Sequence, residues 1–244
     1  TIIIGRSTGI GAIDIADSDN GNIDFSGEAF ALTLRGGATS FNAGVTLPND
    51  KTLTLNTGAI TSPHSGTDVT IGGSGTLSVT ANGTIGISTD PLTMSVASLD
   101  TSSGNNDQSL STTGSTTIGT SGLNAGTGAI TLASGTFVAC DSSSFEDNSD
   151  VVVNGTFDLN GNSEILDALS GTGIVDTTVA GAVTLTTGHN AGSGSFGGTL
   201  QNTSGTLLLT VVGGALSLTN ANTYSGATTV SAGLLDISHT SALG

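Results

Sequence analysis

Apolar and polar residues alternate over short stretches along nearly the whole chain, with a period of two. The segments Leu53–Leu55, Thr76–Val79, Ala129–Leu132 and Leu216–Leu218 are typical, and Thr or Ser takes the polar positions in each. This period is the pattern of β-strands buried on one side, whereas a helix repeats about every 3.6 residues. No stretch sustains the helical repeat, and even Glu164–Leu169 is short enough to be interpreted as strand or turn. The pattern therefore predicts many short β-strands.

A short phrase, Gly-Thr followed by an apolar residue, recurs along the chain. Two copies, at Gly135 and Gly155, are twenty residues apart, and imperfect repetition near this spacing is typical of solenoids. At ~20 residues per coil, the chain would make about twelve coils. The copies begin at Gly75, Gly83, Gly135, Gly155, Gly198 and Gly205.

A solenoid gives each of the abundant residue types a place. One coil of short strands cannot bury its apolar side alone, but the next coil, ~4.8 Å away, pairs with its backbone and covers the core. Gly would occupy turns that need positive φ angles, and Thr and Ser would line the outward side of the strands. The alternative is a β-sandwich, which would use Asn-Gly turns such as Asn82-Gly83. We favour an all-β parallel solenoid.

Composition and charge exclude several classes of protein. Of 244 residues, 38 are Gly, and three Lys or Arg stand against nineteen Asp or Glu, for a net charge of −16. So few cations cannot neutralise phosphates, which excludes nucleic-acid binding. The hydrophobic share of 35% supplies material for a core, which argues against disorder. The longest apolar run, Leu207–Val212, is much shorter than a membrane-spanning helix.

The sequence offers little support for catalysis. Arg6, Arg35 and Lys51 all lie near the beginning of the chain, and aromatic residues are only 3%. Gly5–Gly9 fits the Gly-x-Ser-x-Gly motif of serine hydrolases, but the residues that follow it are interpreted as a strand where that motif requires a helix. We therefore expect no catalytic residues.

Cofactor sites are equally weakly indicated. Asp14–Asp24 is rich in acids, but placing Gly21 at the sixth position of a calcium loop puts Ala16 and Ser18 at ligand positions. The three His residues are scattered without the spacing of a metal site. We expect no cofactor, and only the excess of acids points to calcium.

The C-terminal part of the chain carries a longer motif. It contains Gly155–Asn162, Leu169–Val175, Gly194–Leu200 and, most distinctively, Leu216–Ile237. In this order, over about residues 154–244, these segments resemble the passenger-associated transport repeat of bacterial autotransporters, although Leu stands at position 234 where that family has Thr. The resemblance implies a right-handed parallel β-helix that is secreted through the outer membrane and has a structural repeat without catalytic residues.

The residues that carry the motif are Asn222, Tyr224, Ser225, Gly226 and Gly233. Read on their own, they predict a turn into a strand over 228–230, then a second turn and a strand over 234–237. Tyr224 is the only Tyr, and we expect it to lie over a coil corner with its hydroxyl bonded locally. Residues 1–150 show a looser likeness to filamentous-haemagglutinin-type repeats, as in Gly128–Leu132.

We interpret residues 1–244 as one β-helix segment of a larger or processed chain, with 154–244 as the autotransporter-like module. The leading hypothesis is a rigid structural or adhesive shaft of a secreted or surface-displayed bacterial protein, extracellular or at the cell surface, without catalysis. Its net charge would keep it soluble by repulsion. Loops at Thr101–Ser115 and Cys140–Asp150, which interrupt the strand rhythm, would bind an unidentified host or matrix ligand.

Two alternatives stay open. Thr1–Ile4 and Leu234–Ile237 are apolar and would leave open strand edges, which favours self-association of copies end to end in an extracellular filament. The other alternative is a carbohydrate-active β-helix enzyme, which would need a pair of carboxylates in a groove. Candidates for such a pair are Asp141, Asp147, Asp150 and Asp158.

Overall fold

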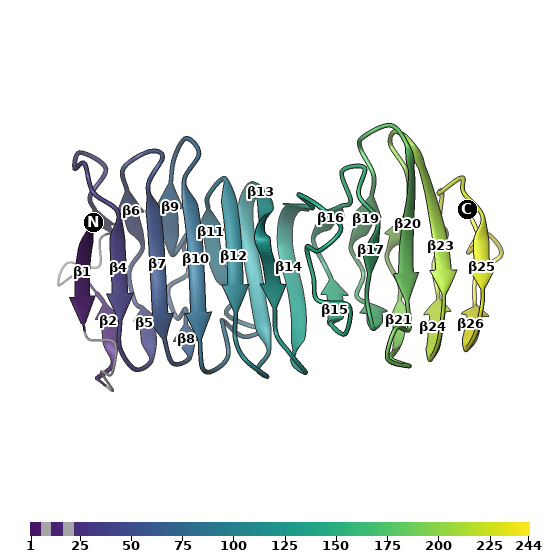
Figure 1. Ribbon diagram of the computed structural model, residues 1–244, viewed down its shortest axis with the longest axis horizontal. Helices are drawn as coiled ribbons and strands as arrows, with labels where there is room; N and C mark the ends of the chain where they lie inside the picture. Colours follow the sequence, from purple (N-terminus) through teal and green to yellow (C-terminus); the bar gives the residue numbers. More distant parts are fainter. Residues whose placement is uncertain (6–10, 17–21) are drawn as a thin grey trace.

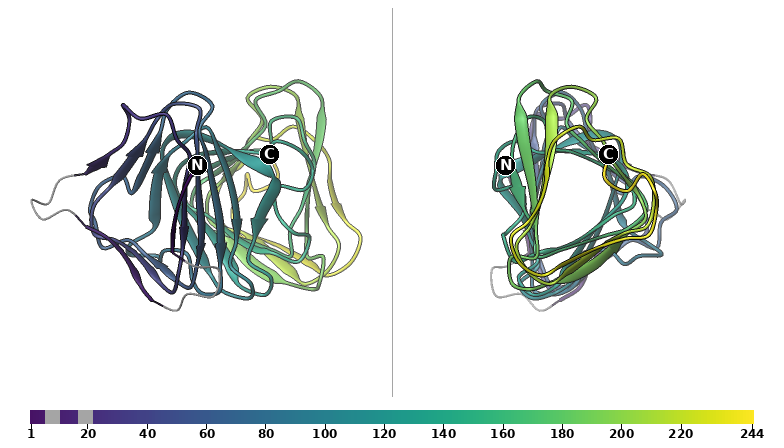
Figure 2. Two further views of the ribbon diagram at one scale, coloured as in Figure 1. Left: turned by 60° about the vertical axis from the view of Figure 1, so that its left-hand side comes forward. Right: turned by 90° about the vertical axis from the view of Figure 1, so that its right-hand side faces the viewer.

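The computed structural model describes residues 1–5, 11–16 and 22–244, and its regular elements in these ranges are all β-strands. The strands stack in parallel in about 10 turns and form an elongated β-solenoid with the two termini at opposite ends (Figure 1). The prediction of an all-β parallel β-helix is therefore confirmed. Seen down its long axis, the solenoid has a roughly triangular outline (Figure 2), because each coil contributes to three faces in a fixed order.

The first face runs along most of the molecule as a parallel ladder, whose register shifts between Leu99 and Thr101. It contains the second parts of β13 (Gln108–Asn124) and β14 (Ala129–Val138) between shorter strands. The shorter strands are β1 (Ile2–Gly5), β4 (Leu32–Arg35), β7 (Thr52–Thr57), β10 (Thr76–Ala81), β12 (Ser98–Ser102), β16 (Thr156–Asp158), β19 (Ile174–Asp176) and β22 (Thr199–Leu200).

The second face follows the first in each coil and is regular only towards the two ends. Its middle is held by single bridges, from Ile60 to Ile85 and from Leu123 to Phe145. Its strands are β2 (Ile13–Ile15), β5 (Thr39–Phe41) and β8 (Ile60–Thr61) at one end, and β17 (Glu164–Ile165), β20 (Ala182–Thr187), β23 (Thr206–Val211) and β25 (Thr228–Val230) at the other.

The third face completes each coil. It includes the first parts of β13 and β14, so these two long strands pass around the corner between the third and first faces. The other strands are β3 (Ile23–Asp24), β6 (Val45–Leu47), β9 (Val69–Ile71), β11 (Leu92–Ser95), β15 (Asp150–Val153), β18 (Ala168–Ser170), β21 (Ser193–Phe196), β24 (Ala215–Leu218) and β26 (Leu234–Ile237).

The core is a set of apolar columns that run along the solenoid. Leu53, Leu77 and Leu99 occupy equivalent positions of three successive coils and are fully buried. Because parallel strands in register place identical positions one above another, the alternation seen in the sequence becomes a continuous apolar interior with Thr and Ser outside. Phe145 and Phe157 meet edge to face in this interior, with ring centroids 5.0 Å apart.

The expected number of coils, about twelve at ~20 residues each, is too high. Thr136 pairs with Thr156, which matches the expected spacing, but Ile174 pairs with Thr199 and Ile2 with Leu32. Coils therefore differ in length, and the longer ones reduce the total to about 10.

The prediction that Thr101–Ser115 protrudes as a loop is wrong, whereas Cys140–Asp150 is an irregular segment of turns and bends with a single β-bridge, at Phe145. In the first segment, Thr101 lies in β12, the residues from Gln108 onward lie in β13, and the buried Gln108 amide accepts a hydrogen bond from Thr101 and donates to the Asn124 carbonyl. In the second segment, the Phe145 side chain is buried in the core, and Phe145 forms the bridge to Leu123 on the second face. Polar residues such as Gln108, which the sequence placed in a loop, therefore belong to the stacked coils and have hydrogen-bond partners there.

Glycines occupy the corner between the third and first faces, which we call the glycine corner. A Cβ atom on Gly173 would lie 2.0 Å from the carbonyl oxygen of Gly155, and one on Gly155 would lie 2.6 Å from that of Gly135. Gly198 has the same relation to Gly173, at 2.1 Å. Adjacent coils approach so closely here that no side chain fits, which explains why the Gly-Thr-apolar phrases at Gly135 and Gly155 recur one coil apart.

This packing predicts the effect of adding one methyl group. Gly173→Ala should destabilise the protein by about 2 kcal/mol or more, because its Cβ would overlap the Gly155 carbonyl oxygen. Gly114→Ala is the matched control on β13, since nothing lies within 4 Å of its Cβ position, and it should change stability by less than about 0.5 kcal/mol. Chemical denaturation measures both, and equal stabilities of the two variants would contradict the close approach.

Candidate functional site

Four residues of the C-terminal motif, from Asn222 to Gly226, lie at the last corner between the first and second faces, and Gly233 lies at the next corner, between β25 and β26. The strands predicted from this motif are confirmed, because β25 spans Thr228–Val230 and β26 spans Leu234–Ile237. Tyr224 is buried, and its hydroxyl forms a 2.6 Å hydrogen bond with Thr228 Oγ1, as expected for a locally bonded corner residue. Burial raises the pKa of this phenol.

Asn222 joins three successive coils. Its side-chain oxygen accepts a hydrogen bond from the Leu200 N–H on the preceding coil, and its amide donates to the Ala242 carbonyl on the following one, each at 2.7 Å. Its own N–H donates to the Ser241 carbonyl. A buried amide can replace ladder hydrogen bonds in this way, because it offers both a donor and an acceptor.

The remaining motif residues also serve coil contacts. The Ser225 N–H donates to the side chain of Asn202 on the preceding coil. A Cβ on Gly226 would lie 2.2 Å from the Leu207 carbonyl oxygen, and Gly233 has a φ of +79° that favours glycine. Through these contacts the motif residues hold adjacent coils together.

The Asn222 bridge predicts a large effect of side-chain removal. Asn222→Ala should cost about 2–4 kcal/mol, because it leaves a buried N–H and a buried C=O without partners. Asn220→Ala, two residues earlier and exposed, should cost less than about 0.5 kcal/mol. The free energy of unfolding in denaturant measures both changes, and a cost for Asn222→Ala no larger than that of the control would show that the bridge adds no stability.

Many of the acids are used in the same way, which the sequence did not reveal. At several corners a carboxylate accepts a hydrogen bond from a backbone N–H of the next coil, at 2.6–3.1 Å. Period-two and charge patterns miss this role because it depends on which residues the coil repeat brings one above another. The pairs are Asp50 with Ser74, Asp100 with Ser121, Asp107 with Ala129, Asp158 with Thr178, Asp167 with Asn190 and Asp176 with Thr203.

Asp176 shows how these hydrogen bonds change the pKa of a carboxyl group at a corner. Burial by itself would raise the pKa of its carboxyl group, but hydrogen bonds from Thr203, Gln201 and the Thr177 N–H favour the ionised form, and the pKa is lowered. Asp158 occupies the equivalent position one coil earlier and accepts both the N–H and the hydroxyl of Thr178. The acids at these corners are therefore structural acceptors.

Glu164 is a carboxyl group enclosed by the wall of the solenoid. Its Oε1 accepts the Ser144 N–H at 2.8 Å, whereas its Oε2 is buried without a hydrogen-bond partner. Burial raises its pKa to about 7. The folded protein therefore resists ionisation of Glu164 near neutral pH.

This pKa predicts how stability depends on pH. Because the folded-state pKa of Glu164 lies above its ordinary value of 4.5, its ionisation should reduce stability as pH rises from about 5 to 8, by an amount on the order of 3 kcal/mol. Glu164→Gln should remove most of that slope, whereas Glu28→Gln, at an exposed position, should leave it unchanged. Unfolding free energies at pH 5 and pH 8 measure the slope, and the same slope in all three proteins would exclude Glu164 as its source.

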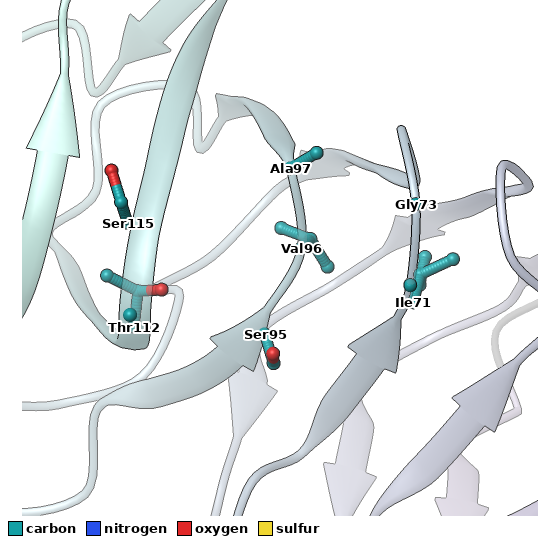
Figure 3. A pocket seen from close by; sticks show the side chains of 9 residues that line it. Ile71, Gly73, Ser95, Val96, Ala97, Thr112 and Ser115 are labelled. Atoms are coloured by element: carbon teal, nitrogen blue, oxygen red, sulfur yellow. The ribbon is translucent and has the colours of Figure 1, made fainter.

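Two hollows lie along the corner between the third and first faces. Figure 3 shows the first, of about 330 Å³, between the turn at Val96-Ala97, the end of β9 at Ile71 and the β13 residues Thr112 and Ser115. The second, of about 440 Å³, lies further along and is lined by Gly, Ser, Thr and Asn residues and Ile174. Neither hollow is lined by an ionisable side chain, so neither provides a carboxylate pair.

The segments suggested for hydrolase and calcium chemistry lie partly outside the described residues. Arg6 and most of Gly5–Gly9 lie outside the described residues, as do residues 17–21 of the acid-rich Asp14–Asp24 segment. Within the described residues, no group of three or more His, Cys, Asp or Glu side chains has a geometry that could hold a metal ion. Cys140 is half-buried after β14, and burial raises the pKa of its thiol.

The fold is a parallel β-solenoid, and the residues of its C-terminal motif form contacts between coils. No family model, no curated protein and no solved structure matches the chain. In the described residues, no helix has the length and apolar character needed to cross a membrane.

Proposed function

We propose that the chain is a structural, adhesive shaft segment of a secreted or surface-displayed bacterial protein, and that it carries out no catalysis. The observation that supports this most strongly is the first face, whose parallel ladder continues from β1 to β22. An uninterrupted ladder with an apolar interior makes a stiff rod, because each coil is bonded to both of its neighbours.

The outer surface suits a shaft in an aqueous environment. The outward positions of the ladder are largely Thr and Ser, as at Thr54 and Ser78, and the net charge of −16 gives mutual repulsion between copies. The resemblance of residues 154–244 to the autotransporter passenger repeat supports export through the outer membrane. The Asn222 corner supports the same assignment, because every bond made by its side chain is an intercoil bond.

A display experiment tests this proposal. The chain is placed between a secretion signal and a translocator barrel in a Gram-negative host. We expect it to reach the cell surface and to resist external protease, because its backbone hydrogen bonds are formed between coils. Gly173→Ala should reach the surface in a protease-sensitive form, whereas Gly114→Ala should behave as the parent chain does. Retention of the parent chain in the periplasm, or its rapid cleavage, would count against the shaft.

End-to-end assembly is a second candidate function, favoured by the two ends of the rod. Ile3 at one end is 56% exposed and Leu234 at the other is 59% exposed, and among the described residues each belongs to a strand that pairs on one side only. An apolar cavity of about 190 Å³, lined by residues such as Ile13, Phe25 and Leu34, opens at the N-terminal end. Electron microscopy of the isolated chain distinguishes the candidates, since filaments support assembly and single short rods support the shaft.

A further inference from the structure

The corner between β8 and β9 contains a buried acid that connects three coils. The Asp68 N–H donates to the Thr93 carbonyl on the following coil, and the Asp68 carbonyl accepts the Val45 N–H from the preceding one, each at 2.8 Å. The side chain adds two bonds, because its Oδ2 accepts the Ser62 hydroxyl at 2.6 Å and the Thr93 N–H at 2.7 Å. Asp68 is thus held at a fixed position in the wall.

One oxygen of this carboxyl group has no hydrogen bond. Asp68 is fully buried, and its Oδ1 lacks a partner although it lies only 3.9 Å from Nδ1 of His64. That nitrogen accepts a hydrogen bond from the Gly66 N–H at 3.3 Å, so in this arrangement it carries no proton. The imidazole lies against Gly66, where a Cβ would be 2.5 Å from its Cε1. Two acceptors therefore face each other across a short gap.

No other charge nearby resolves this mismatch. The neighbouring strands β5, β9 and β11 carry no ionisable residue. Of the acids on adjoining segments, Asp14 accepts a hydrogen bond from Asn42, and Asp90 lies in the turn before β11. His64 is the one group of opposite charge that acts on Asp68 among the described residues.

We propose that Ser62, His64 and Asp68 form a proton-operated clasp. As the medium becomes mildly acidic, Nδ1 of His64 takes up one proton from solvent, gives up the Gly66 N–H and donates to the free Oδ1 of Asp68. The new ion pair closes the corner and anchors Asp68 more firmly to Thr93 on the following coil. The His64 side chain is 22% exposed, which gives the proton a path from solvent.

The acid–base properties of Asp68 agree with this geometry. Burial raises its pKa to about 6, and the hydrogen bonds from Ser62 and Thr93 and the charge of His64 moderate that rise. A protonated His64 favours the ionised form of the Asp68 carboxylate, because the two charges have opposite signs.

Nuclear magnetic resonance of the full chain tests the clasp directly. At pH 8 we expect the His64 proton on Nε2, and on acidification we expect Nδ1 to become protonated before the Asp68 carboxyl does. Over the same range, protection of the Thr93 amide from exchange, corrected for the intrinsic rate, should rise about fivefold. A His64 that stays unprotonated at Nδ1 while Asp68 becomes protonated would overturn the proposal without any variant.

Variants provide a second measure. His64→Phe keeps a ring over Gly66 but removes the cation, so the midpoint of the Asp68 titration should rise by at least about half a pH unit. His189→Phe, at an exposed position, should leave that midpoint unchanged. Both variants are compared with the parent chain at pH 8, where the clasp is open and their folds should be the same. An unchanged Asp68 midpoint in His64→Phe would overturn the proposal.

Discussion

The close approach of backbone to backbone at the glycine corner is the constraint on which the rest of the structure depends. Where Gly155, Gly173 and Gly198 follow one another, each Cα lies against the carbonyl of the coil before it, and no side chain fits. On both sides of this corner, in the first and third faces, these coils pair in parallel and in register. The apolar columns inside and the Thr and Ser rows outside follow from that register.

Charge has a structural role in this molecule beyond solubility. Corner carboxylates such as Asp158 and Asp176 accept backbone N–H groups of the next coil, so part of the acidic surplus replaces ladder hydrogen bonds where the chain turns. Asp68 and Glu164 are more deeply buried carboxyl groups. In each, one oxygen accepts a hydrogen bond and the other has no hydrogen-bond partner. Such groups make the stability of a solenoid respond to pH without any ligand.

The sequence predicted the features that depend on local pattern. Period-two alternation and the Gly-Thr repeat indicated stacked strands, and the Tyr224 motif gave both of its strands, because short-range periodicity and turn residues determine them. The sequence did not predict the features that depend on coil length or on the burial of a single side chain. Gln108 and Phe145 lie in segments that looked like loops, and their burial follows from stacking that no local pattern contains. For the same reason, the sequence did not predict the hydrogen bonds that Asn222 and Asp68 form between coils.

The stacked coils form a rod in which each coil adds length in an equal step. Electron spin resonance distances test this most directly, with one label at Thr54 and a second at Thr117, Thr156 or Thr199 on the same face, in a Cys140→Ser background. For a continuous parallel solenoid we expect narrow distributions that lengthen by ~4.8 Å for every coil between the labels. Distances that reach a plateau or broaden with separation would contradict a continuous parallel solenoid.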